Sequence, residues 1–360
     1  MKDTPPEAPA APPPRGHRWR TGGAGSAAIA WLVPLRVLGS TRLTPWLFGL
    51  LALAVLFSHV NVRLPDTAVA APLGLLALHL ASAMALRPRL RRGGLGLFHV
   101  CLLGCLGLLA WGRLTHFDGR VELAEGTAFD VAAVMPTEQG PWHDRQALAA
   151  LQFTQGRFEV NYAAGVKRAR THSELQLADG SSQSVGDDQA LKLGGWRFYT
   201  THNKGFAPLL TWQAPGQAAQ SGHLHMPAYP LFDWQQLQAW TPPGGPAMKL
   251  WVHPDTPLPT DRAFTLAPGR MAATLVLEVA SQRHSLRAGE AINGPWGQLR
   301  FERLDGWMGY RIHRDPAMLP LLVLALAGVL GLAWHVWPRL ARNLAPQRSP
   351  ATPAGLERLA

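Results

Sequence analysis

Three histidines in strongly apolar surroundings are the residues of this sequence that could do chemistry. His79 lies in the second of four apolar stretches, His99 near the start of the third, and His335 near the end of the fourth. An ionisable side chain is costly inside a membrane, so each is a candidate functional residue. In helices rising about 1.5 Å per residue, His79 lies roughly 10 Å and His99 roughly 6 Å from the same membrane face. Antiparallel neighbours could bring these two imidazoles face to face, an arrangement that suits the axial positions of haem iron.

The same histidines have a second interpretation. A histidine near a helix end can extend toward the aqueous interface or form a hydrogen bond to a neighbouring helix. His59 and His116, at the opposite ends of the first and third stretches, fit that interpretation as well as His335 does. The spacing alone therefore leaves haem binding and helix packing open.

Other polar groups in the sequence predict little chemistry. Cys101 and Cys105 stand one helical turn apart, without the spacing of a redox Cys-x-x-Cys, and small residues in such a helix commonly serve close packing. His223 and His225 alternate along an expected strand, as two metal ligands or as a pair with other partners. Phosphate-binding loops, nucleophile elbows and His-Glu-x-x-His motifs are missing, which argues against an ordinary hydrolase or nucleotide enzyme.

Four apolar stretches free of Lys, Arg, Asp and Glu must position these residues. Each approaches the roughly 20 residues that a helix needs to cross the hydrocarbon core, so four transmembrane helices are expected. Three come early in the chain and one comes late. They are Trp46–Val60, Ala68–Leu86, Leu95–Trp111 and Met318–Trp337.

Charge predicts the orientation of these helices. With a cytoplasmic N-terminus, the segments 1–44, 87–94 and 338–360 carry a net charge of +11, which equals the net charge of the whole chain. The exported part is then neutral, and the basic excess follows the positive-inside rule rather than indicating a nucleic-acid partner. The lipid bilayer is the expected surrounding, with both termini in the cytoplasm and the large domain in the periplasm.

The rest of the chain divides into two tails and one large outer domain. Residues 1–43 are expected to be disordered, with an interfacial helix over Ser26–Leu43, and residues 338–360 to form an unstructured cytoplasmic tail. Residues 44–113 would hold three crossings and 317–337 the fourth. The outer domain, 114–316, reads as mainly β, either a sandwich or a distorted barrel, with one helix at Leu231–Trp240. Its expected strands include Phe158–Tyr162, Ser173–Leu177, Trp196–Thr200, Lys249–Val252, Ala273–Val279 and Gly297–Phe301.

Several local strings add a textual resemblance to this architecture. They are Phe98-His99, Leu114-Thr115-His116-Phe117-Asp118-Gly119, Leu123-Ala124-Glu125-Gly126, Ser173-Glu174-Leu175, Leu193-Gly194-Gly195-Trp196-Arg197-Phe198-Tyr199, Gly309-Tyr310-Arg311-Ile312-His313-Arg314-Asp315-Pro316 and His335-Val336-Trp337. In order and content they resemble the ResB (CcsB) family of cytochrome c biogenesis proteins. Together they cover most of Leu95–Trp337.

The resemblance implies a subunit of the System II cytochrome c synthase in the inner (cytoplasmic) membrane. Such a complex moves haem b across the membrane and joins it to apocytochrome c, and this subunit works with a ResC/CcsA-type membrane protein. The family's third-helix haem ligand maps onto His99, with the second axial ligand expected from that partner. The chain alone would then be an incomplete part of a haem lyase. The alternative is a cofactor-free membrane scaffold or sensor whose outer β domain binds a periplasmic protein.

Overall fold

The described residues form four long helices. The computed structural model describes residues 35–60, 67–230 and 236–344. The helices are α2 (Thr44–His59), α3 (Thr67–Leu86), α4 (Gly93–Thr115) and α6 (Met318–Leu344). Of these, α3, α4 and α6 are long and apolar enough to cross a membrane. Helix α2 has 16 residues, or about 24 Å of helix against a hydrocarbon core of about 30 Å. The described chain therefore has three membrane-length helices and one shorter apolar helix.

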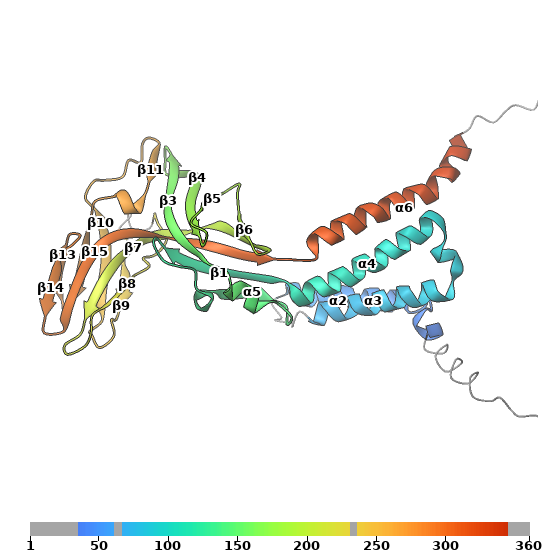
Figure 1. Cartoon of the computed structure of the whole chain (residues 1–360), viewed down its shortest axis with the longest axis horizontal. Coiled ribbons are helices and arrows are strands. Elements are labelled where there is room, and N and C mark those ends of the chain that lie inside the picture. Colours follow the sequence, from blue (N-terminus) through green and yellow to red (C-terminus); the bar gives the residue numbers. More distant parts are fainter. Residues whose placement is uncertain (1–34, 61–66, 231–235, 345–360) are drawn as a thin grey trace, which may run out of the picture.

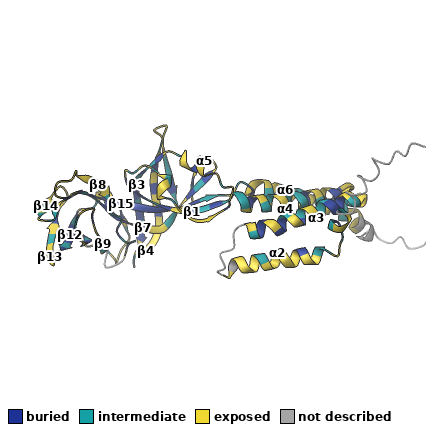
Figure 2. Cartoon of the chain, turned by 90° about the horizontal axis from the view of Figure 1, so that it is seen from below, coloured by how far each residue is buried: buried dark blue, intermediate teal, exposed yellow. Residues whose placement is uncertain are grey.

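These helices form a row instead of a closed bundle. Helix α6 packs on α4, α4 packs on α3, and α3 packs on α2. Helix α2, at one edge, has only a narrow stripe of buried or half-buried residues, and most of its residues are exposed (Figure 2). The stripe consists of Thr44, Leu47, Leu51 and Ala54, spaced by three or four residues so that they share one helix face. Both edges of the row thus present apolar side chains outward.

Small residues bring α4 and α6 into close contact. A methyl group built on Gly94 would collide with the backbone of Gly331 and His335, and one built on Gly328 would lie 3.2 Å from Cβ of Cys101. Interfaces of this kind let helix backbones approach where the surroundings are as apolar as the helices themselves. Cys101 is a free, buried thiol within this contact, as expected of a packing residue.

The outer region is organised around one large sheet. Its seven strands follow the order β2-β1-β15-β7-β6, with β14 on β15 and β8 on β7. Strands β7 (Trp196–Gln213) and β15 (Gly297–Arg314) have 18 residues each and pair antiparallel. Strand β1 (Phe117–Ala124) follows α4 and β15 precedes α6, so this sheet carries both connections to the helices (Figure 1). The other strands are β2 (Met135–Gln139), β6 (Leu191–Leu193), β8 (Gln220–His223) and β14 (Ala291–Gly294).

Two four-stranded sheets complete the outer region. One has the order β11-β3-β4-β5, and the other, β13-β12-β10-β9, lies at the end farthest from the helices (Figure 1). Their strands are β3 (Phe153–Ala163), β4 (Lys167–Leu177), β5 (Ser182–Gly186), β9 (Gln238–Trp240), β10 (Met248–Pro254), β11 (Phe264–Leu266), β12 (Ala273–Val279) and β13 (Gln282–Leu286). A short helix, α5 (Arg145–Ala149), precedes β3.

Buried side chains from all three sheets meet in one core, which contains fully buried Trp196, Phe198 and Phe206. One polar network lies inside it. The Tyr310 hydroxyl donates to Oε1 of Gln155 at 2.7 Å and lies 2.7 Å from the Ser173 hydroxyl. This network joins β15 to β3 and β4 and so links two sheets without any disulfide.

The structure excludes one alternative and corrects two expectations. Of the sandwich and the distorted barrel, the barrel is excluded for the described residues, because their sheets are not closed into one. The helix expected over Leu231–Trp240 is wrong at Gln238–Trp240, which form β9 because they pair with β10, while 231–235 lie outside the described residues. The unstructured tail expected from residue 338 is wrong up to Leu344, since α6 continues through Pro338. The expected disorder of 1–34 and 345–360 lies outside the described residues. Of the expected interfacial helix, residues 35–43 are described: 35–38 are helical, and 39–43 are turn or irregular.

Candidate functional site

His99 lies in the second turn of α4 with one ring nitrogen held and the other free. Its Nδ1 is 2.7 Å from the carbonyl oxygen of Leu95, one turn earlier in the helix. A carbonyl can only accept, so Nδ1 carries a proton, and in the neutral tautomer with this hydrogen bond Nε2 has the lone pair. Within the described part of the chain Nε2 has no hydrogen-bond partner. Metal-binding histidines commonly have this arrangement, with the far nitrogen fixed by a backbone carbonyl.

His79 is held at both nitrogens. Its Nδ1–H donates to the carbonyl oxygen of Leu38, which leaves Nε2 to accept from the Thr44 hydroxyl at 2.9 Å. The side chain is buried, with 8% exposed. His79 therefore joins α3 to the segment that enters α2, and the helix-packing interpretation describes what it does in this structure.

His335 lies where α6 packs against the start of α4. Its backbone nitrogen stands beside Gly94, and its side chain is half-buried. His99 follows Gly94 by five residues, which turns it about 140° around α4 from that contact. The three sequence-predicted histidines are thus separate: His79 faces the start of α2, His335 flanks the contact with α6, and His99 points elsewhere. No described interaction brings any two of them together.

Haem is the group expected at these histidines, and His79 and His99 differ in how well they could bind it. An axial ligand needs a neutral imidazole with an unused nitrogen, which His99 offers. His79 offers none without losing a hydrogen bond from Thr44, so a His79–His99 axial pair has no support in the described arrangement. Of the two, His99 is the residue that would hold a haem group, through Nε2.

The outer histidine pair is engaged with carboxylates. His223 Nε2 lies 2.9 Å from Asp305, and His225 Nδ1 lies 3.4 Å from Glu122 while its ring stacks on Trp307. Burial raises the pKa of Asp305, but hydrogen bonds from His223 and Arg303 outweigh it, and the pKa is lowered overall. The part of the chain that the structure describes holds no cluster of three metal-ligating side chains. The interpretation of these histidines as a pair with other partners fits this geometry.

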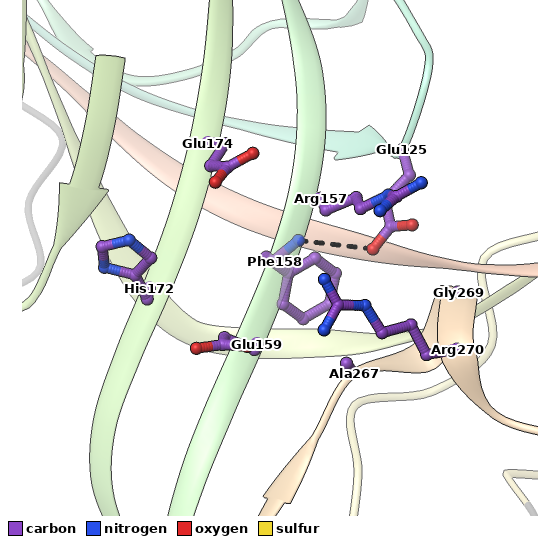
Figure 3. Close-up of a pocket in the computed structure, with 9 residues that line it drawn as sticks. All are labelled: Glu125, Arg157, Phe158, Glu159, His172, Glu174, Ala267, Gly269 and Arg270. Carbon is purple, nitrogen blue, oxygen red and sulfur yellow. Dashed lines mark hydrogen bonds between the residues drawn. The ribbon is translucent and has the colours of Figure 1, made fainter. Parts of the chain in front are cut away.

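A pocket of about 350 Å³ in the outer domain contains a buried acid. Glu125 directly follows β1, and its Oε1 accepts from the backbone N–H of Phe158 at 3.4 Å (Figure 3). The pairing of β3 with β4 shifts register between Gln155 and Phe158, beside this carboxyl group. A side chain at Gly269 would come within 2.7 Å of Glu125 Oε2. The lining residues are Glu125, Arg157, Phe158, Glu159, His172, Glu174, Ala267, Gly269 and Arg270.

Burial raises the pKa of Glu125 to about 7. The Phe158 N–H and the nearby Arg157 and Arg303 oppose this rise, while Asp305 adds to it. A second buried group is Lys204, whose pKa falls to about 8 because burial disfavours its charge and Arg168 repels it. Sequence reasoning missed both as titratable groups. For Glu125 a signal existed, since it continues the alternation of buried residues along β1 that includes Val121 and Leu123; Lys204 gave none.

The fold and these groups define a membrane protein with a row of apolar helices and a mainly-β domain inserted before the last helix. A family model described as the ResB-like family matches residues 78–345, more than half of the chain. The chain belongs to this family, which has a role in cytochrome c biogenesis. The match includes His79, His99, His335 and the whole β region. No curated protein matches the chain.

Proposed function

We propose that this protein is the subunit of a cytochrome c maturation complex that takes haem across the membrane and presents it to apocytochrome c. A ResC/CcsA-type membrane protein is the expected partner. Family membership supports the biogenesis role. The free Nε2 of His99, in a helix long enough to cross a membrane, carries the haem assignment.

The proposed work of this chain is positioning. Bound haem supplies the vinyl groups to which the cysteine thiols of the apocytochrome add. The Leu95 carbonyl fixes the His99 ring and its tautomer, so the lone pair on Nε2 has one direction relative to α4. An orientation fixed in advance lowers the entropic cost of holding a planar ligand.

The proposed topology has four crossings with both termini in the cytoplasm and the β domain in the periplasm. Arg87, Arg89, Arg91 and Arg92 fall between α3 and α4, where the positive-inside rule favours the cytoplasmic side of the inner membrane. Helix α2 would be the fourth crossing although it is about 6 Å short of the hydrocarbon core, a mismatch that a locally thinner bilayer can accommodate.

The test is an absorption spectrum of the full chain in mild detergent, with and without the partner, for wild type, His99→Ala and His79→Ala. We expect a reduced b-type haem band that needs the partner, is lost in His99→Ala and persists in His79→Ala. Added imidazole should restore the band to His99→Ala, because it can fill the vacated axial position. That rescue separates loss of a ligand from loss of the fold.

Two results would count against the proposal. Full haem in His99→Ala would remove the ligand assignment while leaving a haem-handling role. No haem in any preparation that contains the partner would favour the cofactor-free scaffold, in which the outer domain binds a periplasmic protein and the helices only anchor it.

A further inference from the structure

The turn Gly140–His143 of the outer domain is attached to the last turn of α4. The Gly140 N–H donates to the carbonyl of His116 at 2.9 Å, and the Trp142 N–H donates to the carbonyl of Leu114 at 2.8 Å. Any side chain on Gly140 would collide with the backbone of Leu114. The turn also closes on itself, since the His143 ring donates to the carbonyl of Gly140 at 2.8 Å. Its height relative to α4 is therefore fixed.

Trp142 is 65% exposed on this turn. The other tryptophans with large exposure, within the described ranges, are Trp46, Trp111, Trp334 and Trp337, and all four lie in α2, α4 or α6. The described tryptophans of the β sheets are buried or half-buried. Trp142 is thus the one strongly exposed tryptophan that the described part of the outer domain presents.

The position of Trp142 accounts for that exposure. Trp111 lies three residues before Leu114, about 4.5 Å along the axis of α4, so the backbones of Trp111 and Trp142 lie within about one helical turn of each other near the end of a membrane-length helix. Tryptophan is favoured at the headgroup level because its ring is apolar and its N–H is polar. Arg113 and Arg145, both exposed, supply cations near this level for lipid phosphates.

We propose that the turn Gly140–His143 is a lipid-binding element that inserts Trp142 into the headgroup layer next to the β domain. The contact extends the lipid-facing surface that α4 already forms. It gives the outer domain an attachment to the bilayer in addition to its two chain connections to α4 and α6. Its consequence is a fixed tilt of the β domain over the membrane. The inference needs α4 to span the bilayer and does not depend on haem.

Depth measurement with a nitroxide label tests the proposal. The label is attached to Trp142→Cys in the full chain with Cys101→Ala and Cys105→Ala, reconstituted without partner in phosphatidylcholine–phosphatidylglycerol vesicles. Asn293→Cys, in β14 at the far end of the domain, is the control in water, and Leu326→Cys, 59% exposed on α6, is the control in lipid. We expect collisions with a water-soluble nickel complex at 142 to be at least about twofold rarer than at 293, and collisions with oxygen to fall between the two controls.

Collision rates at 142 equal to those at 293 would overturn the proposal, because the turn would then face water. Protection at 142 that appears only when a protein partner is added would overturn it too, in favour of a protein contact. A second variant, Trp142→Asp, keeps the backbone hydrogen bonds and places a charge at the headgroup level. Faster hydrogen exchange of the residue 142 amide in vesicles, but not in detergent, is the expected result.

Discussion

The buried carboxyl group of Glu125 gives the sharpest prediction about stability. Its pKa rises from 4.5 to about 7 in the folded protein, mainly because burial disfavours the charged form. Each unit of pKa corresponds to about 1.4 kcal/mol, so ionising this group costs the fold about 3 kcal/mol. The folded state binds the proton more tightly than the unfolded state. The stability that protonated Glu125 contributes is therefore complete below the unfolded pKa of this group. It is lost as the pH rises from there through 7.

Glu125→Gln should remove this dependence on pH. The amide oxygen of glutamine can still accept from the Phe158 N–H, and the side chain has no charge to bury. We expect the variant to be up to about 3 kcal/mol more stable than wild type near pH 8 and nearly equal to it near pH 4, below the unfolded pKa. For a region of this size that difference corresponds to a midpoint about 6–12 °C higher at the upper pH.

The assay is thermal unfolding of the full chain in lipid nanodiscs, followed by tryptophan fluorescence at both pH values. Glu159→Gln is the matched control, because Glu159 lines the same pocket from a more exposed position on β3. It should leave the pH dependence as in wild type. If wild type and Glu125→Gln lost stability in parallel between the two pH values, the buried carboxyl group would not be the cause and the reasoning would fail.

Two further substitutions test the packing. Tyr310→Phe removes the hydroxyl that donates to Gln155 inside the core, so the same unfolding assay should show a loss of about 1–3 kcal/mol, whereas Tyr199→Phe, 37% exposed, should have little effect. Gly94→Ala should force α4 and α6 apart, because its methyl group meets the backbone of Gly331, while Gly107→Ala, which has open space, should not. The measurement is cross-linking of cysteines engineered across α4 and α6. Cross-linking should be weaker in Gly94→Ala only, and equal cross-linking in both variants would contradict the contact.

The helices and many strands could be predicted because their signals are local. The stretches Leu95–Trp111 and Met318–Trp337 both lie inside observed helices, and Ala273–Val279 is strand β12 residue for residue. Apolar composition and alternation decide these elements without knowledge of the rest of the chain. Helix α6 was placed too short because Pro338 and the basic residues after it resemble a helix end, whereas a single proline removes only one hydrogen bond of the helix.

The errors arise where residues far apart in the sequence determine the local structure. Gln238–Trp240 lie in a sequence that reads as helical, but pairing with Met248–Leu250 makes them a strand. The role of His79 depends on Leu38 and Thr44, about 40 residues away, which no local pattern reveals. Glu125 is buried by Gly269 and Phe158, so its raised pKa is a tertiary effect. In each case the residue that determines the outcome lies far away in the sequence, so no local pattern could predict it.

The contrast between His79 and His99 limits how haem could be held. Both are histidines in apolar helices, yet long-range contacts occupy both nitrogens of His79, and a carbonyl within its own helix occupies one nitrogen of His99. Among the described residues, His99 therefore keeps a ring nitrogen without a hydrogen bond, and His79 does not. If haem binds at His99, the Nε2 of this one side chain would hold it, and His79 would add no ligand without losing its hydrogen bond from Thr44. This arrangement supports a function in complex with a second membrane protein, and it predicts that haem bound to this chain alone would be weak.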